Sequence, residues 1–189
     1  MTLRSTATRY GLVAQCLHWI TAALVLAAYV ESVGGPEARV YSEARDGIRN
    51  VHETLGMVLF GVVLLRVLWR LADPPPVLHS GPFWIVRSAR VVHVMLYVLL
   101  VLIPLTAIVG TWLEGHPLTL VGVRIDPWLP SSRALGQWVI DAHTISGNAL
   151  MWLAALHTAA ALLHHYRYRD GVLESMLPAR WRRTVPAEP

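Results

Sequence analysis

Four histidines of this 189-residue chain lie in apolar stretches, and each is followed four positions later by a small residue. The four pairs are His18 and Ala22, His52 and Gly56, His143 and Gly147, and His157 and Ala161. Residues four apart share one face of a helix, so each small residue leaves space beside its imidazole ring. Ionisable side chains inside membrane segments are costly and usually mark functional sites. The pattern favours a flat, bulky ligand beside each ring, and haem is the candidate.

The elements that carry these histidines are four apolar stretches. The chain is 54% hydrophobic and 15% charged, whereas soluble domains carry roughly 25% charged residues. Each stretch has the ~20 residues that a helix needs to cross a bilayer. The stretches are Leu12–Val30, Val51–Leu71, Val91–Leu113 and Ala142–His165, with loops predicted at Leu71–Pro76 and Gly115–Pro130. The sequence predicts an all-α membrane protein, a four-transmembrane-helix bundle over residues 1–178, with a short basic, proline-containing tail at 179–189.

Arginine supplies all sixteen basic residues and indicates how the bundle is oriented. One side of the membrane would carry Arg4, Arg9, Arg66, Arg70, Arg87, Arg90, Arg167, Arg169, Arg180, Arg182 and Arg183. The other side would carry Arg39, Arg45, Arg49, Arg124 and Arg133. The positive-inside rule then predicts that both termini are cytoplasmic. Because the arginines flank membrane spans, we expect no nucleic-acid partner.

The first apolar stretch follows Arg4 and Arg9, as in a signal peptide. It is longer than a typical signal-peptide core, contains His18–Trp19 and ends at Val30–Glu31 without a small-x-small cleavage site, so we interpret it as a retained helix. Cys16 is the single cysteine, which excludes an intramolecular disulfide and a CxxCH haem attachment. Cys16 is expected to pack as a small apolar residue.

This topology sorts the four histidines by depth. His52 and His143 fall near the outer surface, and His18 falls in the cytoplasmic half of its helix. His157 follows His143 by fourteen residues, which is ~21 Å along a helix and nearly four whole turns. The predicted pairs are therefore His52 with His143 and His18 with His157, each suited to bis-histidine haem. Two histidines alone make a poor zinc site.

Arg66 follows His52 by the same fourteen residues, so it shares the face of His52 at the depth of the inner pair. Two interpretations remain open. An arginine at this position could pair with a haem propionate. Alternatively, its side chain could snorkel to the cytoplasmic interface.

The five other histidines are weaker ligand candidates. His93 lies in the cytoplasmic half of the third stretch, but its neighbour four residues on is Tyr97, which would obstruct a porphyrin. It is either a packing residue or part of a quinone site. His164 faces nearly the same way as His157. Its ring either interacts favourably with the C-terminus of its helix or serves as a hydrogen-bond partner or proton donor for a quinone. His165 is rotated away, and His79 and His116 are expected to be solvated loop residues.

The sequence resembles the bacterial cytochrome b561 family over nearly its whole length, up to about Pro178. The similar segments are Arg9–Tyr10, Leu17–Trp19, Val51–Gly56, Leu65–Arg70, Pro74–Pro76, Ala142–His143, Leu156–Tyr166, Asp170–Leu173 and Met176–Pro178. The resemblance implies a multi-pass di-haem b protein of the bacterial inner membrane. It also implies that the axial ligands of the two haem irons fall on His18, His52, His143 and His157.

The resemblance further implies a superoxide:ubiquinone oxidoreductase, in which superoxide or another small periplasmic donor is oxidised and ubiquinone is reduced. Bis-histidine iron has no open position, so outer-sphere electron transfer is expected. The five outer arginines could attract superoxide, although eight acidic residues share that side: Glu31, Glu37, Glu43, Asp46, Glu53, Glu114, Asp126 and Asp141. Alternatively, the protein is a cytochrome b anchor subunit that passes electrons between a partner dehydrogenase or hydrogenase and the quinone pool. A superoxide:ubiquinone oxidoreductase would require no protein partner.

Overall fold

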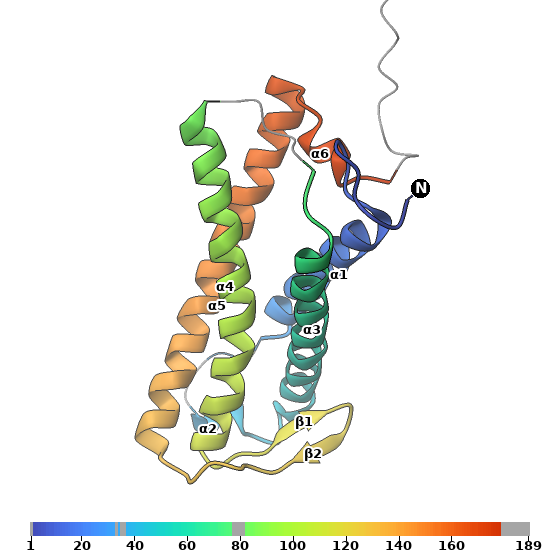
Figure 1. The fold of residues 1–189 in the computed structure, drawn as a ribbon. Helices are drawn as coiled ribbons and strands as arrows, with labels where there is room; N and C mark the ends of the chain where they lie inside the picture. The colour runs from blue at the N-terminus through green and yellow to red at the C-terminus, as the bar shows by residue number, and fades with distance from the viewer. Residues whose placement is uncertain (1, 33, 35–36, 77–81, 179–189) are drawn as a thin grey trace, which may run out of the picture.

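The computed structural model describes residues 2–32, 34, 37–76 and 82–178, and four long helices dominate it (Figure 1). The helices are α1 (Leu12–Val30), α3 (Asp46–Ala72), α4 (Phe83–Leu113) and α5 (Arg133–Leu163). Each is long and apolar enough to cross a membrane. The predicted four-helix class is confirmed. The predicted tail at 179–189 and His79 lie outside the described residues.

Three helices begin earlier than the apolar stretches predict: α3 at Asp46 rather than Val51, α4 at Phe83 rather than Val91, and α5 at Arg133 rather than Ala142. Charged residues interrupt the extra turns, among them Asp46, Arg49, Arg87, Arg90, Arg133 and Asp141, so a search for unbroken apolar runs leaves these turns out. In α3, Arg49 pairs with Asp46 and with Glu53, each at 2.8 Å. Such pairs three and four residues apart stabilise helical turns outside the hydrocarbon.

Short elements occupy the connections. They are α2 (Glu37–Val40), the antiparallel strands β1 (Leu118–Leu120) and β2 (Val123–Ile125), a π-helical turn (His164–Tyr168) and α6 (Val172–Ser175). The hairpin lies in a segment that the sequence predicts as loop. Its two central residues, Val121 and Gly122, have φ of 50° and 78°, as a type I′ turn requires. Glu53 of α3 accepts a 2.6 Å hydrogen bond from the Thr119 backbone N–H, which attaches the hairpin to the bundle.

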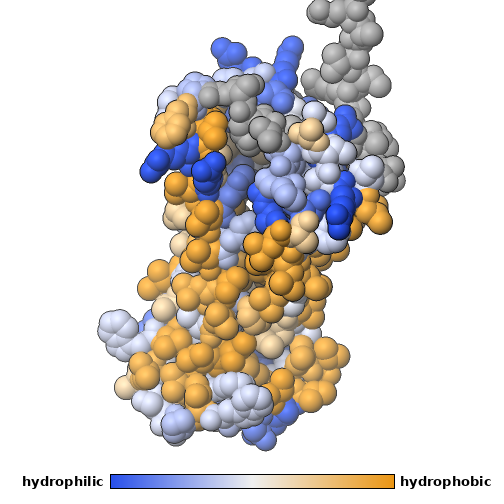
Figure 2. All heavy atoms as spheres, viewed as in Figure 1, coloured by the Kyte–Doolittle hydropathy of each residue, from blue (hydrophilic) through white to orange (hydrophobic). Residues whose placement is uncertain are grey.

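The long helices pack as two pairs, α1 with α3 and α4 with α5 (Figure 1). Leu59, Val63, Leu100 and Leu150 form the buried cluster where the pairs meet. Many apolar side chains instead face outward. On the face seen in Figure 2 they form a broad band across the middle of the molecule, with hydrophilic side chains gathered above it. This distribution suits a bundle surrounded by lipid.

The N-terminal segment and α6 lie at the same end of the bundle (Figure 1). The Gln15 side-chain amide of α1 donates to the carbonyl of Ser175 at 3.1 Å. The Trp19 indole N–H donates to the carbonyl of Met176 at 2.9 Å. Both described ends of the chain are thus on one side of the membrane-spanning region, the side that arginine counting predicts to be cytoplasmic.

Asp73 ties the N-terminal segment to the end of α3. The Ser5 hydroxyl donates to its carboxylate at 2.6 Å, and the Ser5 backbone N–H donates at 3.0 Å. Burial by itself raises the pKa of the Asp73 carboxyl, but the hydrogen bonds from Ser5 outweigh it and hold this pKa below the ordinary value of 3.8. The ionised carboxylate therefore stabilises the folded state.

We expect Asp73→Ala to lower the midpoint of thermal unfolding at pH 7 by about 2–6 °C, because two charge-assisted hydrogen bonds are lost. A depressed pKa adds stability that is present above the unfolded value and is lost as pH falls through the folded value. The difference between variant and wild type should therefore shrink below pH 3.8. Asp126→Ala, at a side chain 76% exposed, is the control and should change the midpoint little. An equal midpoint for Asp73→Ala and wild type at pH 7 would contradict this assignment.

Candidate functional site

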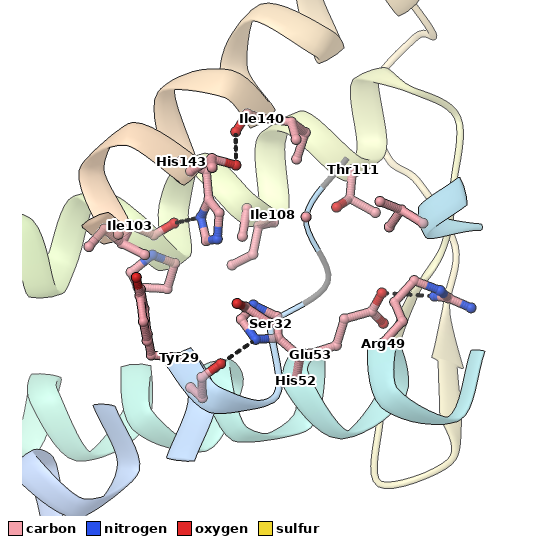
Figure 3. A pocket seen from close by; sticks show the side chains of 18 of the residues that line it. Tyr29, Ser32, Arg49, His52, Glu53, Ile103, Ile108, Thr111, Ile140 and His143 are labelled. Carbon is pink, nitrogen blue, oxygen red and sulfur yellow. Dashed lines mark hydrogen bonds and ion pairs between the residues drawn. The ribbon is translucent and has the colours of Figure 1, made fainter. Parts of the chain in front are cut away.

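His52 of α3 and His143 of α5 face each other near the end of the bundle that carries α2 and the hairpin (Figure 3). Their ring centroids are 6.2 Å apart, and the ring planes cross at 87°. Metal–imidazole bonds are about 2.0–2.1 Å long and a ring atom lies about 1.1 Å from its centre, so two in-line imidazoles on one metal have centroids about 6.3 Å apart. The spacing of this pair suits a shared metal ion.

Backbone carbonyls orient both of these rings. The Nδ1 atom of His52 lies 2.7 Å from the Ala28 carbonyl oxygen, and the Nδ1 atom of His143 lies 2.9 Å from that of Ile103 (Figure 3). A carbonyl only accepts, so Nδ1 carries the proton and Nε2 keeps the lone pair that a metal needs. Ala28 lies in the last turn of α1, where carbonyls have no partner within the helix. The end of one helix thus fixes the ligating form of a histidine on another.

A cavity of about 810 Å³ surrounds this outer pair and is lined by His52, His143 and their small neighbours Gly56 and Gly147. A Cβ atom added to either glycine would meet nothing within 4 Å. At Gly110, by contrast, an added Cβ would lie 2.7 Å from the Ile140 side chain. Cofactor sites typically enclose about 300–1,000 Å³. The cavity, the open faces of the two glycines and the paired imidazoles fit haem.

His18 of α1 and His157 of α5 form the inner pair, with ring centroids 6.4 Å apart and planes crossing at 71°. The Arg66 guanidinium donates to Nδ1 of His18 at 2.9 Å and lies over the Tyr97 ring, 5.3 Å from its centroid. Arg66 thus points to the inner pair in this structure. That it pairs with a haem propionate stays a prediction.

His93 of α4 also lies at the inner pair, with its ring centroid 5.3 Å from that of His157. This is shorter than the ~6.3 Å that two in-line imidazoles on one metal require. The ring meets His157 at 69°, as an edge-to-face neighbour. The geometry suits a supporting residue beside the inner pair, and a quinone role for His93 stays a prediction.

Two carboxylates that sequence reasoning missed contact the histidines at the end of α5. Nδ1 of His164 lies 2.5 Å from the Asp170 carboxylate. Nδ1 of His165 lies 2.6 Å from the Glu174 carboxylate, an ion-pair distance without hydrogen-bond alignment. Both histidines lie in the π-helical turn, a rare conformation that is frequent at functional sites. The turn folds the chain back, which the helical spacing of the sequence could not predict.

His116 is a loop residue, as predicted, but its side chain is only 26% exposed. Its Nε2 atom lies 2.8 Å from the Glu37 carboxylate, and its ring stacks on Tyr41 with centroids 3.5 Å apart at 16°. His116 follows α4 directly, so the tight connection to the hairpin brings it back over α2. Contacts between separate connections leave no periodic signal in the sequence.

Carboxylates hold two of the five outer arginines that were expected to attract superoxide. Arg124 pairs with Asp126 at 3.0 Å, and Arg49 is held by Asp46 and Glu53. The polar end of the cavity is lined by Arg49 and by four carboxylates, those of Glu37, Glu53, Glu114 and Asp141. The lining of this cavity is therefore more acidic than basic, and electrostatic attraction of superoxide stays a prediction.

Comparison with known proteins decides which family this bundle represents. The sequence pattern of prokaryotic cytochrome b561 matches residues 9–179, which includes all four long helices and all four paired histidines. The chain belongs to the prokaryotic cytochrome b561 family. Membership in this family implies haem b, membrane electron transfer and a multi-pass location in the bacterial inner membrane.

Three relatives align along most of their lengths. Cytochrome b561 homolog 2 of Escherichia coli is 26% identical over 94% of this chain and 95% of its own. Cytochrome b561 homolog 1 of Escherichia coli is 26% identical over 87% of this chain and 94% of its own. The probable superoxide oxidase CybB of Yersinia pestis is 26% identical over 87% of this chain and 93% of its own. This cytochrome b561 is thus similar throughout to proteins of its own size.

Proposed function

We propose that this cytochrome b561 carries electrons across the inner membrane through two bis-histidine haems, from a donor at the outer surface to ubiquinone near the cytoplasmic surface. The observation that carries the proposal is the spacing of the two histidine pairs, 6.2 Å and 6.4 Å between ring centroids. The ligands on α5, His143 and His157, are ~21 Å apart along the helix. Haem b held at both pairs would supply one-electron transfer.

The two pairs differ in which ring nitrogen is free to bind iron. In the outer pair, the carbonyls of Ala28 and Ile103 already hold the tautomer with a free Nε2 lone pair. In the inner pair, Arg66 donates to Nδ1 of His18, which leaves the proton of the neutral ring on Nε2. Ligation through Nε2 therefore requires Arg66 to release His18. A released Arg66 would be available to a propionate, the role expected for it.

Superoxide is the donor that we propose, supported by the similarity to a relative named as a probable superoxide oxidase. Each superoxide would lose one electron and leave as dioxygen. Two superoxide ions and two protons would therefore convert one ubiquinone to ubiquinol. Because carboxylates line the polar end of the outer cavity, access would depend on diffusion more than on charge attraction.

The protons would enter at the cytoplasmic end, close to the inner pair. His164 with Asp170 forms a histidine–carboxylate contact of 2.5 Å there. A histidine that a carboxylate orients suits proton delivery to a reduced quinone. His93, against His157, is the second candidate for contact with the quinone.

Stopped-flow mixing of the purified, oxidised protein with superoxide tests this function. We expect rapid haem reduction without any partner protein, followed by reoxidation when ubiquinone is present, with dioxygen and ubiquinol as products. A protein denatured before mixing is the control for direct chemistry between superoxide and quinone. Failure of superoxide to reduce the haems, together with a redox subunit that copurifies, would instead support an anchor subunit for a dehydrogenase or hydrogenase.

A further inference from the structure

A second group of ligating side chains lies at the outer end of the bundle, apart from the paired histidines. Glu37 comes from α2, Glu114 follows α4, and His116 precedes β1. One ligand atom from each of the three lies within 4.8 Å of the others. Two parts of the chain that are distant in sequence, α2 and the connection from α4 to β1, thus bring two carboxylates and an imidazole together.

Glu114 is the most buried member of the cluster. Its side chain lines the end of the outer cavity, and the residue is only 5% exposed. Within the described ranges its carboxylate accepts no hydrogen bond. A buried carboxylate that accepts no hydrogen bond costs free energy that a bound cation would recover.

The two other members are already held in place. The His116 ring is stacked on Tyr41, and its Nε2 atom lies 2.8 Å from Glu37. Arg133 approaches Glu37 only to 3.9 Å, and its side chain is 78% exposed, so it neutralises the cluster weakly. Ligands of one tetrahedral metal ion lie about 3.4 Å apart. Small side-chain rotations would therefore close the cluster around an ion.

We propose that Glu37, Glu114 and His116 bind a divalent cation of the zinc type. A donor set of one imidazole and two carboxylates suits Zn²⁺, with water as the remaining ligand. The bound ion would join α2 to the end of α4, so it would fix the first connection over the polar end of the outer cavity. The site uses none of the four paired histidines and does not depend on the electron-transfer proposal.

Equilibrium dialysis of the purified full-length, haem-loaded protein against Zn²⁺ tests the site. We expect the wild type to bind one Zn²⁺ more than Glu114→Gln, which removes a charged ligand with little change in shape. His116→Gln should weaken this site by at least about tenfold. Glu43→Gln, an exposed glutamate of the same connection, is the matched control and should bind as the wild type does.

Two further measurements separate loss of the site from loss of the fold. Haem content should be equal in wild type and Glu114→Gln, and Zn²⁺ should raise the unfolding temperature of the wild type more than that of the variant. The X-ray absorption spectrum of the zinc-loaded wild type should show oxygen and nitrogen ligands with one imidazole. Equal Zn²⁺ binding by wild type and Glu114→Gln, or a spectrum with two or more imidazoles, would overturn the proposal.

Discussion

His157→Ala should halve the haem content of the purified protein, from two b-type haems per chain to one. The inner pair loses a ligand, and a single histidine holds haem b weakly, whereas the outer pair keeps His52 and His143 at 6.2 Å. The haem-to-protein ratio and the reduced-minus-oxidised difference spectrum measure this effect. The remaining b-type bands should be those of the outer haem.

His93→Ala is the matched control for His157→Ala. Its ring is 5.3 Å from that of His157, so the substitution perturbs the same region without removing a proposed ligand. We expect His93→Ala to keep both haems. If His93→Ala lost a haem and His18→Ala kept both, His93 would replace His18 as the partner of His157.

Gly56→Leu should remove the outer haem and keep the inner one. The Cβ position at Gly56 is open, and Gly56 lines the cavity beside His52, so a leucine side chain would occupy the space proposed for the macrocycle. Helix propensity favours leucine over glycine, so α3 itself should not be weakened. Haem content and the spectrum of the remaining haem report the result.

Gly61→Leu on the same helix is the control for this substitution. An added Cβ at Gly61 also meets nothing within 4 Å, and the residue is exposed on the outside of the bundle. We expect Gly61→Leu to keep two haems per chain. Two haems in Gly56→Leu would show that the cavity beside His52 is not where the outer haem binds.

Much of the fold could be predicted because lipid imposes a simple rule on sequence. Helices that cross a bilayer need long apolar runs, so the existence of all four was predictable. Because His157 follows His143 by fourteen residues, helix geometry predicts their separation and their shared face from the sequence alone. The structure has His52 beside His143 and His18 beside His157, whereas their binding of iron stays a prediction.

The polar connections could not be predicted in the same way. Asp46, Arg49 and Glu53 extend α3 beyond its apolar run through ion pairs that hydropathy does not register. The contact of His116 with Glu37 joins residues 79 positions apart, and it follows from the path of two connections. The sequence left two interpretations of Arg66 open because the direction of its side chain depends on His18 and Tyr97, which lie on other helices.

The arrangement of the long helices as two pairs has a consequence for the life of the protein in the cell. Among the described residues, Leu59, Val63, Leu100 and Leu150 form the buried cluster between the pairs, and a cavity of about 810 Å³ lies beside it. Haem bound there as proposed would become part of the core and stabilise the folded state by mass action. A bacterium short of haem would then lose this protein to proteolysis, so its abundance would follow the haem supply.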